Sequence, residues 1–538
     1  MSSTSRNPRR PPTALRLLVA SAAIGGLGCT GLVAAAALAD PAPERAPVYR
    51  DYGASNTSLP PSIPDADSGS IITGQPFEDP PIIASGASDL AVTLTASAQP
   101  VRISGKLMNG RVYAASSQGV EYPASFMPPV LRLRRGQRLI INLQNRLPES
   151  TNIHTHGFFI SPKGNQDDVF EQLLVGGNSQ HVYTNTQHLS PGSYWFHPHL
   201  HPLVEEQVFG GMSGLIDVQG LRSMLPSGLR NITEHYVGLK DFQVMKGVNT
   251  IPLRDINSQA DTNRTVNGMV QPVITMAAGE TQLWHMGNIG ADIWYDIQAS
   301  GLKVWVIAED GNPVVRPYQA RDLLMPPARR FDLLVQAPKA GTFTLITRKM
   351  NTGPQGDSYP RTLLATVNVT GTGTAPVAAV PKTYGTEIDL SKATIARHRI
   401  FRLSENGAGT KFFINGKPWP GPNQMSASPV IGTVEQWTFT NSAGEEHPIH
   451  IHVNDMQVMS INGVKQGTDS WVDTIPVPAA KDDRHPGTVV MRMAFRTYTG
   501  PYVFHCHILA HEDNGMMNNV NVTSPPATGS LLASGPPA

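Results

Sequence analysis

The residues best suited to chemistry lie in one segment near the C-terminus, HCHILAHEDNGMM. Cysteine occurs only twice in 538 residues, and one of the two, Cys506, stands between His505 and His507. A further imidazole follows at His511 and a thioether at Met516. Alternate residues of a strand point to opposite faces, so the two flanking histidines would face one way and the thiol the other. A metal at Cys506 would then be joined through a short stretch of backbone to metals at both histidines.

Three other histidine motifs, HTH, HPH and HPIHIH, stand at matching positions of an internal repeat. The four motifs hold ten of the 17 histidines: His154, His156, His197, His199, His447, His450, His452, His505, His507 and His511. The middle copy of the repeat has other residues at these places: Trp294, Ile297, Ala299, Ile346, Thr347 and Arg348. Metal chemistry is therefore expected in the first and third copies only.

The repeat also predicts the elements that position these side chains. GQRLIINLQN, GETQLWHMGN and GTVEQWTFTN share a glycine, alternating apolar residues and a final asparagine, and PGSYWFHPHL, AGTFTLITRK and TGPYVFHCHI form a second recurring set. The alternation of Leu139, Ile141 and Leu143 indicates a half-buried strand. The repeats lie about 150 residues apart, a usual domain size. We predict three antiparallel β-sandwich domains at 85–228, 232–374 and 385–523.

The regions outside the repeats differ in composition. Residues 40–84 are rich in Pro, Ser, Gly and Asp and are predicted to form an extended arm, and 524–538 a disordered tail. The net charge of +1 gives no electrostatic reason to expect nucleic acid or an anionic membrane as a partner. Charged residues make up 15% of the chain, against a typical value of about 25%.

Residues 1–39 are typical of a secretory signal peptide. A basic start precedes an uncharged apolar run, which ends in Ala37-Leu38-Ala39. Arg9-Arg10 permits twin-arginine export, and an uncleaved membrane anchor is the less favoured alternative. We expect a periplasmic or secreted protein without a stable membrane partner after cleavage. Its one remaining thiol, Cys506, could form no internal disulfide.

The donor types decide between metals. Two imidazoles, a thiolate and a distant thioether, from His447, His511, Cys506 and Met516, suit a blue-copper electron-transfer site. The other eight motif histidines form four pairs, enough for a cluster of about three coppers between the first and third domains. Zinc does not change redox state and would leave the path through Cys506 without a role.

HTHG, HPH, HPIHIH and HCHILAHEDNGMM together resemble the copper signatures of three-domain multicopper oxidases. The resemblance is strongest to the bacterial branch of spore-coat laccase, cuprous oxidase and bilirubin-oxidase-like enzymes. It implies an all-β chain of three tandem cupredoxin-like Greek-key domains and about four coppers. It also implies one-electron oxidation of a reductant, a phenol or aromatic amine for preference, coupled to four-electron reduction of dioxygen to water. A monomer is favoured.

The resemblance assigns a role to each motif residue. His447, Cys506 and His511 would hold type 1 copper, with Met516 axial. Type 2 copper would take His154 and His450. The type 3 pair would take His156, His197, His199, His452, His505 and His507. Electrons would cross from Cys506 to His505 and His507.

Two carboxyl groups are candidates for proton supply. Glu512 directly follows His511 and resembles the acid that serves dioxygen reduction in the bacterial branch. Asp167, in GNQDDVF after the HTHG motif, is the candidate for a second acid near type 2 copper, with Asp168 close behind. The seven remaining histidines fit no register and are interpreted as structural or exposed: His181, His188, His201, His235, His285, His398 and His485.

Other functions fit the sequence less well. A copper nitrite reductase would have two such domains and fewer histidines. An electron carrier or copper-resistance protein using only the type 1 site leaves eight histidines unexplained. A metallo-oxidase for cuprous, ferrous or manganous ions stays open, although no methionine-rich run is present and Met456, Met459, Met491 and Met493 are interpreted as core residues.

Overall fold

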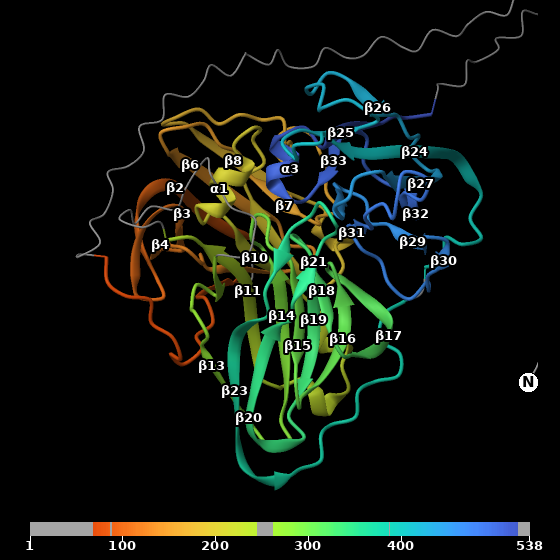
Figure 1. Ribbon diagram of the computed structural model, residues 1–538. Helices are drawn as coiled ribbons and strands as arrows, with labels where there is room; N and C mark the ends of the chain where they lie inside the picture. The colour runs from red at the N-terminus through yellow and green to blue at the C-terminus, as the bar shows by residue number, and fades with distance from the viewer. Residues whose placement is uncertain (1–67, 85, 87–88, 245–261, 387, 526–538) are drawn as a thin grey trace, which may run out of the picture. The chain divides into compact units, whose positions relative to one another are not determined.

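The structure is a computed structural model that describes residues 68–84, 86, 89–244, 262–386 and 388–525. The predicted signal peptide and most of the predicted arm and tail lie outside these residues. Each copy of the repeat contributes a pair of packed β-sheets, shown in Figure 1. Among the described residues, no helix has the length and apolarity needed to cross a membrane.

The first pair of sheets is built from ten strands, with orders β4-β3-β2-β6-β8 and β1-β5-β10-β9-β7. Their bounds are β1 Ile82–Ala84, β2 Leu90–Ile103, β3 Lys106–Ser117, β4 Val120–Ser125, β5 Val130–Arg134, β6 Leu139–Arg146, β7 His154–His156, β8 Asn178–Tyr183, β9 Gly192–His197 and β10 Gly214–Gln219. Short helices surround them: η2 Thr186–His188, α1 Val204–Phe209, α2 Leu221–Met224 and η3 Ser227–Leu229.

The second pair has the orders β12-β11-β14-β19-β16-β17 and β13-β23-β20-β15-β18. Its strands are β11 Glu234–Phe242, β12 Asn263–Val266, β13 Val273–Ala277, β14 Thr281–Asn288, β15 Tyr295–Ala299, β16 Lys303–Glu309, β17 Asn312–Ala320, β18 Leu323–Met325, β19 Arg330–Gln336, β20 Lys339–Thr347 and β23 Thr362–Thr374. A separate two-stranded ribbon joins β21 Met350–Asn351 to β22 Ser358–Tyr359.

The third pair has the orders β25-β24-β27-β32-β29-β30 and β26-β34-β33-β28-β31. Its elements are β24 Ile395–Glu405, β25 Phe412–Ile414, β26 Met425–Ala427, β27 Val434–Asn441, β28 His447–Ile451, β29 Gln457–Ile461, β30 Val464–Lys465, β31 Thr474–Val477, β32 Gly487–Ala494, β33 Gly500–Cys506, α3 Leu509–Asp513 and β34 Met517–Val522. The exact domain boundaries remain predictions from the sequence.

The repeated segments form equivalent strands, but the sheets are not wholly antiparallel. The strands β6, β14 and β27 each run parallel to one neighbour, β2, β11 or β24, and antiparallel to the other. The prediction of purely antiparallel sheets was therefore wrong. Each parallel pair is separated in the chain by other strands, so the second strand of the pair can return in the same direction as the first. Leu139, Ile141 and Leu143 are fully buried, as their alternation predicts.

A second pair of strands is equivalent in all three domains, and it carries the candidate ligands in the outer two. Strand β7 pairs with β9, β15 with β20 and β28 with β33, all antiparallel. The register sets His154 opposite His197 and His450 opposite His505. Each outer domain thereby brings two of its histidine motifs side by side on neighbouring strands of one sheet.

Candidate metal centres

A compact group of three donors lies in the third domain. The Nδ1 atoms of His447 and His511 are each 3.7 Å from Sγ of Cys506 and 3.3 Å from one another. His447 begins β28, Cys506 ends β33 and His511 lies in α3. All three side chains are buried, and His511, at 7%, is the most exposed of them. The three atoms face one point, where a single metal ion could contact all of them.

Local backbone bonds bring Met516 to this group. The amide of Cys506 donates to the carbonyl oxygen of Met516 at 3.0 Å, and the amide of Met516 donates to that of His511 at 2.9 Å. The methionine side chain is fully buried. Phe412 stacks on the imidazole of His511 with the ring centroids 3.8 Å apart. The aromatic contact restrains the ring, and the site lies in apolar surroundings.

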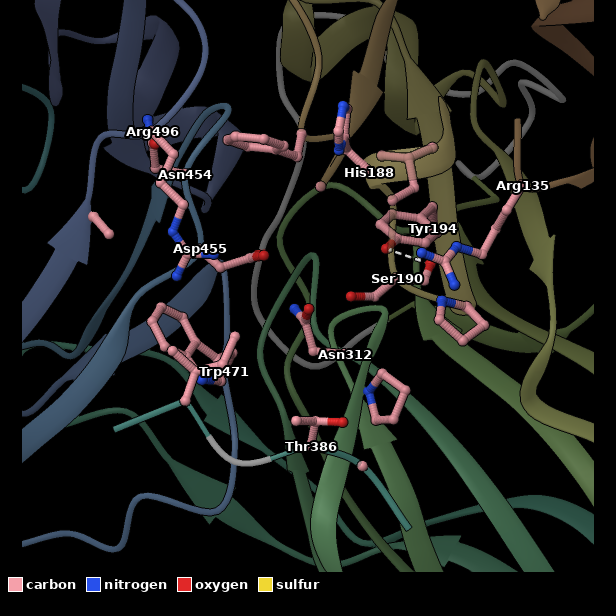
Figure 2. A pocket seen from close by; sticks show the side chains of 18 of the residues that line it. Arg135, His188, Ser190, Tyr194, Asn312, Thr386, Asn454, Asp455, Trp471 and Arg496 are labelled. Carbon is pink, nitrogen blue, oxygen red and sulfur yellow. Dashed lines mark hydrogen bonds between the residues drawn. The ribbon is translucent and has the colours of Figure 1, made fainter. Parts of the chain in front are cut away.

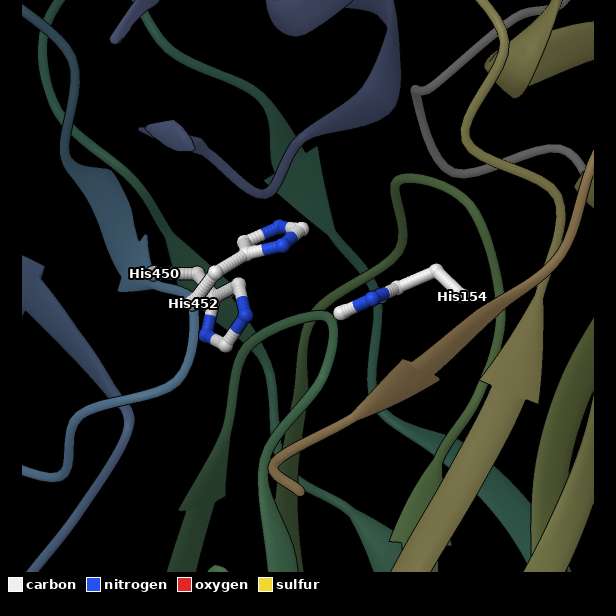
Figure 3. Close-up of side chains that lie close together, drawn as sticks. All are labelled: His154, His450 and His452. Carbon is white, nitrogen blue, oxygen red and sulfur yellow. The ribbon is translucent and has the colours of Figure 1, made fainter. Parts of the chain in front are cut away.

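The other eight motif histidines meet between the first and third domains. Figure 3 shows His154 facing His450 and His452, which come from the other domain. His154 stacks on His452 at 4.0 Å between centroids, and His156 stacks on His450 at 3.8 Å. All eight residues are 1% exposed or less: His154, His156, His197, His199, His450, His452, His505 and His507.

Six of the eight histidines separate into two sets of three. The Nε2 atoms of His199, His452 and His505 lie 3.1–3.2 Å apart. The rings of His156, His197 and His507 have centroids 5.0–5.8 Å apart. Both sets combine histidines of the first and third domains, and His154 and His450 remain as the seventh and eighth. The arrangement offers several neighbouring sites, as the sequence predicts.

In several of these imidazoles, one ring nitrogen contacts a polar group of the protein and the other is available to a ligand. Nδ1 of His154 contacts Asp167, that of His197 contacts the carbonyl of Pro198, and that of His450 contacts the carbonyl of Asp473. Nε2 of these three rings is buried with no hydrogen-bond partner among the described residues. Buried nitrogens without partners are costly unless they bind something. Fixing one nitrogen while the other binds is the usual arrangement of metal-ligating histidines, so the residues fit copper.

Burial also keeps these imidazoles neutral. It lowers the pKa of His447 to about 3. It is likewise the main cause that lowers the pKa of His450 to about 4. A neutral imidazole has the lone pair that a metal ligand needs. Both groups are therefore ready to bind a metal ion at neutral pH.

Both candidate acids lie against the histidines. One Asp167 oxygen is 2.8 Å from Nδ1 of His154, and the other accepts from the amide of Thr155 at 2.8 Å. Glu512 lies 2.8 Å from Nδ1 of His505 and 3.3 Å from Nε2 of His199. The carboxylate of Asp168 instead accepts from the backbone amide of Phe170 at 3.1 Å.

His201 fits no register of the repeat and is interpreted as structural or exposed. It is only 8% exposed and lies against Glu512, which contacts the cluster. Its Nε2 is 2.9 Å from Glu512, and its Nδ1 is 2.9 Å from Asp513. The signal that could have found it is the third alternating histidine in HPHLH.

Asp473 also lies against the cluster, and no sequence motif predicted it. Its Oδ1 is 3.2 Å from Nε2 of His156, and its carbonyl oxygen is 2.9 Å from Nδ1 of His450. It precedes β31 and is 1% exposed. No histidine, cysteine or glycine motif surrounds it in the sequence, so pattern reasoning had no means of selecting it.

A cleft of about 430 Å³ opens where residues of all three domains meet (Figure 2). Tyr194 lies on one side, Asp455 and Trp471 lie on the other, and Asn312 of the middle domain lies between them. Gly157, which directly follows His156, also lines the cleft. Polar groups from all three domains thus meet in this cleft.

Three family models, each described as multicopper oxidase, match residues 109–222, 241–371 and 392–526. Multicopper oxidase mco of Staphylococcus aureus is 25% identical over 415 residues, covering 76% of this chain and 84% of that protein. A laccase of Bacillus stratosphericus is 23% identical over 464 residues, covering 74% and 90%. A solved multicopper oxidase from Campylobacter jejuni, described as a metallo-oxidase, has a TM-score of 0.70 at 23% identity, covering 86% and 98%. The predicted fold of cupredoxin-like domains is confirmed.

Proposed function

Because the chain belongs to the multicopper oxidase family and is of the laccase type, we propose that phenols or aromatic amines are its reducing substrates. The family binds four copper ions of types 1, 2 and 3 and uses dioxygen as the acceptor. When bound, copper supplies the one-electron oxidations and the reduction of dioxygen to water.

We assign the mononuclear centre to type 1 copper. His447, Cys506 and His511 would supply the three close donors, and Met516 would supply a thioether. The support is the equal 3.7 Å spacing of both Nδ1 atoms from Sγ, together with the burial of the methionine. Two imidazoles, one thiolate and a weak thioether form the donor set of blue-copper sites.

We assign the eight-histidine cluster to the remaining copper ions. His154 and His450 would hold type 2 copper. One type 3 copper would take His156, His197 and His507, and the other would take His199, His452 and His505. The support is the separation into two sets of three, each shared between the outer domains.

The observation that carries the proposal is that the C-terminal end of strand β33 contributes to both metal centres. The thiol of Cys506 faces the mononuclear group, while His505 and His507 on either side of it lie in the cluster. The two centres are therefore joined by covalent bonds of the backbone. An electron carrier has no use for the second centre, and that alternative is not favoured.

We propose that Glu512 and Asp167 hold protons for dioxygen reduction. Glu512 touches His505, His199 and His201, and Asp167 touches His154. Each carboxyl is buried against imidazoles assigned to the cluster.

Access to the mononuclear centre bears on the substrate. His511 is 7% exposed and His447 is fully buried, so electrons would enter at the His511 edge. Nε2 of His511 lies 3.6 Å from a carboxylate oxygen of Glu445. An aromatic substrate resting near this edge would need no metal-capturing insert, and the sequence has no methionine-rich run.

Oxygen uptake by the copper-loaded protein tests the substrate. The panel should contain phenols, aromatic amines, Cu(I), Fe(II) and Mn(II), with Cys506→Ser as the control for uptake that bypasses the centre. We expect saturable uptake with the aromatic reductants that the control lacks. Saturable uptake with metal ions alone would contradict the proposed substrate class and would leave the oxidase assignment intact.

We also propose that the protein is exported and loses residues 1–39. The support is the basic, then apolar, then Ala-Leu-Ala pattern of this segment. N-terminal sequencing of the protein isolated from cells should begin at Asp40. A mature chain that still begins at its first residues would contradict cleavage.

A further inference from the structure

The middle domain has no histidine at the ligand positions, yet one of its side chains reaches the cluster. Arg330, the first residue of β19, is fully buried. Its two terminal nitrogens donate to the two carboxylate oxygens of Asp473 at 2.8 and 2.7 Å. The middle domain thus forms a bidentate ion pair with a residue of the third domain.

Asp473 connects this ion pair to two proposed copper ligands. Its Oδ1 lies 3.2 Å from Nε2 of His156, and its carbonyl oxygen lies 2.9 Å from Nδ1 of His450. In His156 the remaining nitrogen, Nδ1, is buried without a partner, and in His450 it is Nε2. The contacts with Asp473 therefore determine which nitrogen each ring can offer to a metal.

We infer that Arg330 is a positioning residue for the cluster, acting through Asp473 on the proposed type 2 ligand His450 and on the neighbouring type 3 ligand His156. The inference rests on the proposed assignment of these two histidines to copper. It gives the middle domain a part in the metal centre although it supplies none of the ligands.

Further hydrogen bonds fix the position of Arg330. Its Nε donates to the carbonyl oxygen of Ser193 in the first domain at 3.2 Å, and its backbone amide donates to Asp310 at 3.0 Å. The other oxygen of Asp310 accepts from the amide of Asp473 at 3.2 Å. Two residues of the middle domain, Asp310 and Arg330, thus hold both the backbone and the side chain of Asp473.

The glycine of the HTHG motif leaves room for the ion pair. A Cβ at Gly157 would lie 2.5 Å from a terminal nitrogen of Arg330 and 2.7 Å from a carboxylate oxygen of Asp473. Its φ of +85° is also a conformation that favours glycine. The motif residue after His156 is therefore explained by a side chain that the middle domain contributes.

A lysine could keep the charge at position 330 but could not form the same two-pronged contact. Arg330→Lys should leave Asp473 free to turn and should loosen His156 and His450. Changes in residues that orient metal ligands typically weaken metal binding about 10–100-fold. The type 1 centre, which has no part in these contacts, should keep its blue absorption.

The test compares Arg330→Lys with Arg264→Lys in the copper-loaded protein. Arg264 is the matched control, since it is buried in the same domain and donates to the carbonyl oxygen of Trp294 instead of to Asp473. The readouts are the type 2 electron paramagnetic resonance signal, the blue absorption and copper retention against a chelator. We expect a changed type 2 signal and about 10–100-fold weaker retention for Arg330→Lys only, with blue absorption intact in both.

Two results would overturn the inference. One is an unchanged type 2 signal with full copper retention in Arg330→Lys. The other is equal loss of type 1 and type 2 signals in both variants, which is what general loosening of the domain contacts would produce. If Arg330→Lys does not fold, Asp473→Asn must show the altered type 2 signal with intact blue absorption, and a normal signal there contradicts the inference. If the wild-type protein itself showed neither the blue absorption nor the type 2 signal, the proposed function would instead be refuted.

Discussion

At the scale of single residues, Cys506 connects the two centres. Its thiol faces His447 and His511, and its backbone neighbours lie in the cluster. Cys506→Ser removes the sulfur that gives blue copper its colour and the path between the centres. We expect loss of the blue absorption and nearly all oxidase activity, measured by spectrophotometry and oxygen uptake. Retention of the blue absorption would contradict the type 1 assignment.

Met516 permits a directional test of the same centre. A long thioether donates weakly to copper and stabilises the oxidised state more than a hydrocarbon does. Met516→Leu should therefore raise the reduction potential of the type 1 site and keep its colour, as measured by redox titration. Met517→Leu, at the neighbouring buried position, is the control. An unchanged or lowered potential in Met516→Leu would show that this methionine is not axial.

Glu512 separates the two halves of the reaction. Glu512→Gln keeps the size and hydrogen-bonding capacity of the side chain but removes its transferable proton. Reduction of the type 1 site by substrate should keep its rate, and reoxidation by dioxygen should slow by about 10²–10⁴-fold. Stopped-flow measurement of both half-reactions checks this, with Asp168→Asn as the control. Equal slowing of both halves would indicate a disturbed His511 instead of a lost proton donor.

The motif residues could be predicted because their spacing repeats along the chain. The positions of His154, His450 and Cys506 follow from that register alone. The alternation in HPHLH could have selected His201 but not its partners, and Asp473 could not be selected, since it reaches the cluster through contacts made only after folding. His201 meets Glu512 from over 300 positions away, and Asp473 meets Arg330 of another domain.

At the scale of elements, β14 shows how packing between domains changes a predicted strand. Its sequence alternates like its equivalents, yet every residue of β14 is buried. The reason is β9 of the first domain, where Ser193 contacts His285 of β14. His285 also lies beside Asp332 and, at 3.1 Å, beside Glu234. The alternation predicted the strand, but it could not predict that a second domain would cover the outer face.

This network predicts a stability that depends on pH. Burial alone would lower the pKa of His285, but Asp332 and Glu234 raise it to about 10. The folded state thus binds a proton that the unfolded chain, with a pKa near 6.5, holds less tightly. The resulting stability is fully present below about pH 6.5 and is lost as the pH rises through about 10.

His285→Gln should therefore lower the urea midpoint of unfolding clearly at pH 6 and much less at pH 10. His485→Gln is the control, because its ring is 68% exposed beside Asp482. A His285→Gln deficit of the same size at both pH values would contradict the predicted protonation.

At the scale of the whole molecule, the three domains divide the work unequally. The outer two supply all proposed ligands, and the middle one offers Ile297 and Ala299 where they have histidines. The number of domains and the location of chemistry in the outer two could be predicted from repeats. The contribution of Arg330 could not be predicted from the sequence. The repeat shows that the middle domain lacks the histidines, but it does not show which of its side chains contact another domain.

Copper analysis of the purified, copper-loaded protein, with Cys506→Ser in parallel, tests the central claim most directly. The unchanged chain should hold four coppers, the number that the family binds. Cys506→Ser should hold about three, because only the mononuclear centre loses a donor. A reproducible value of one copper in the unchanged chain would contradict the account and would indicate an electron carrier.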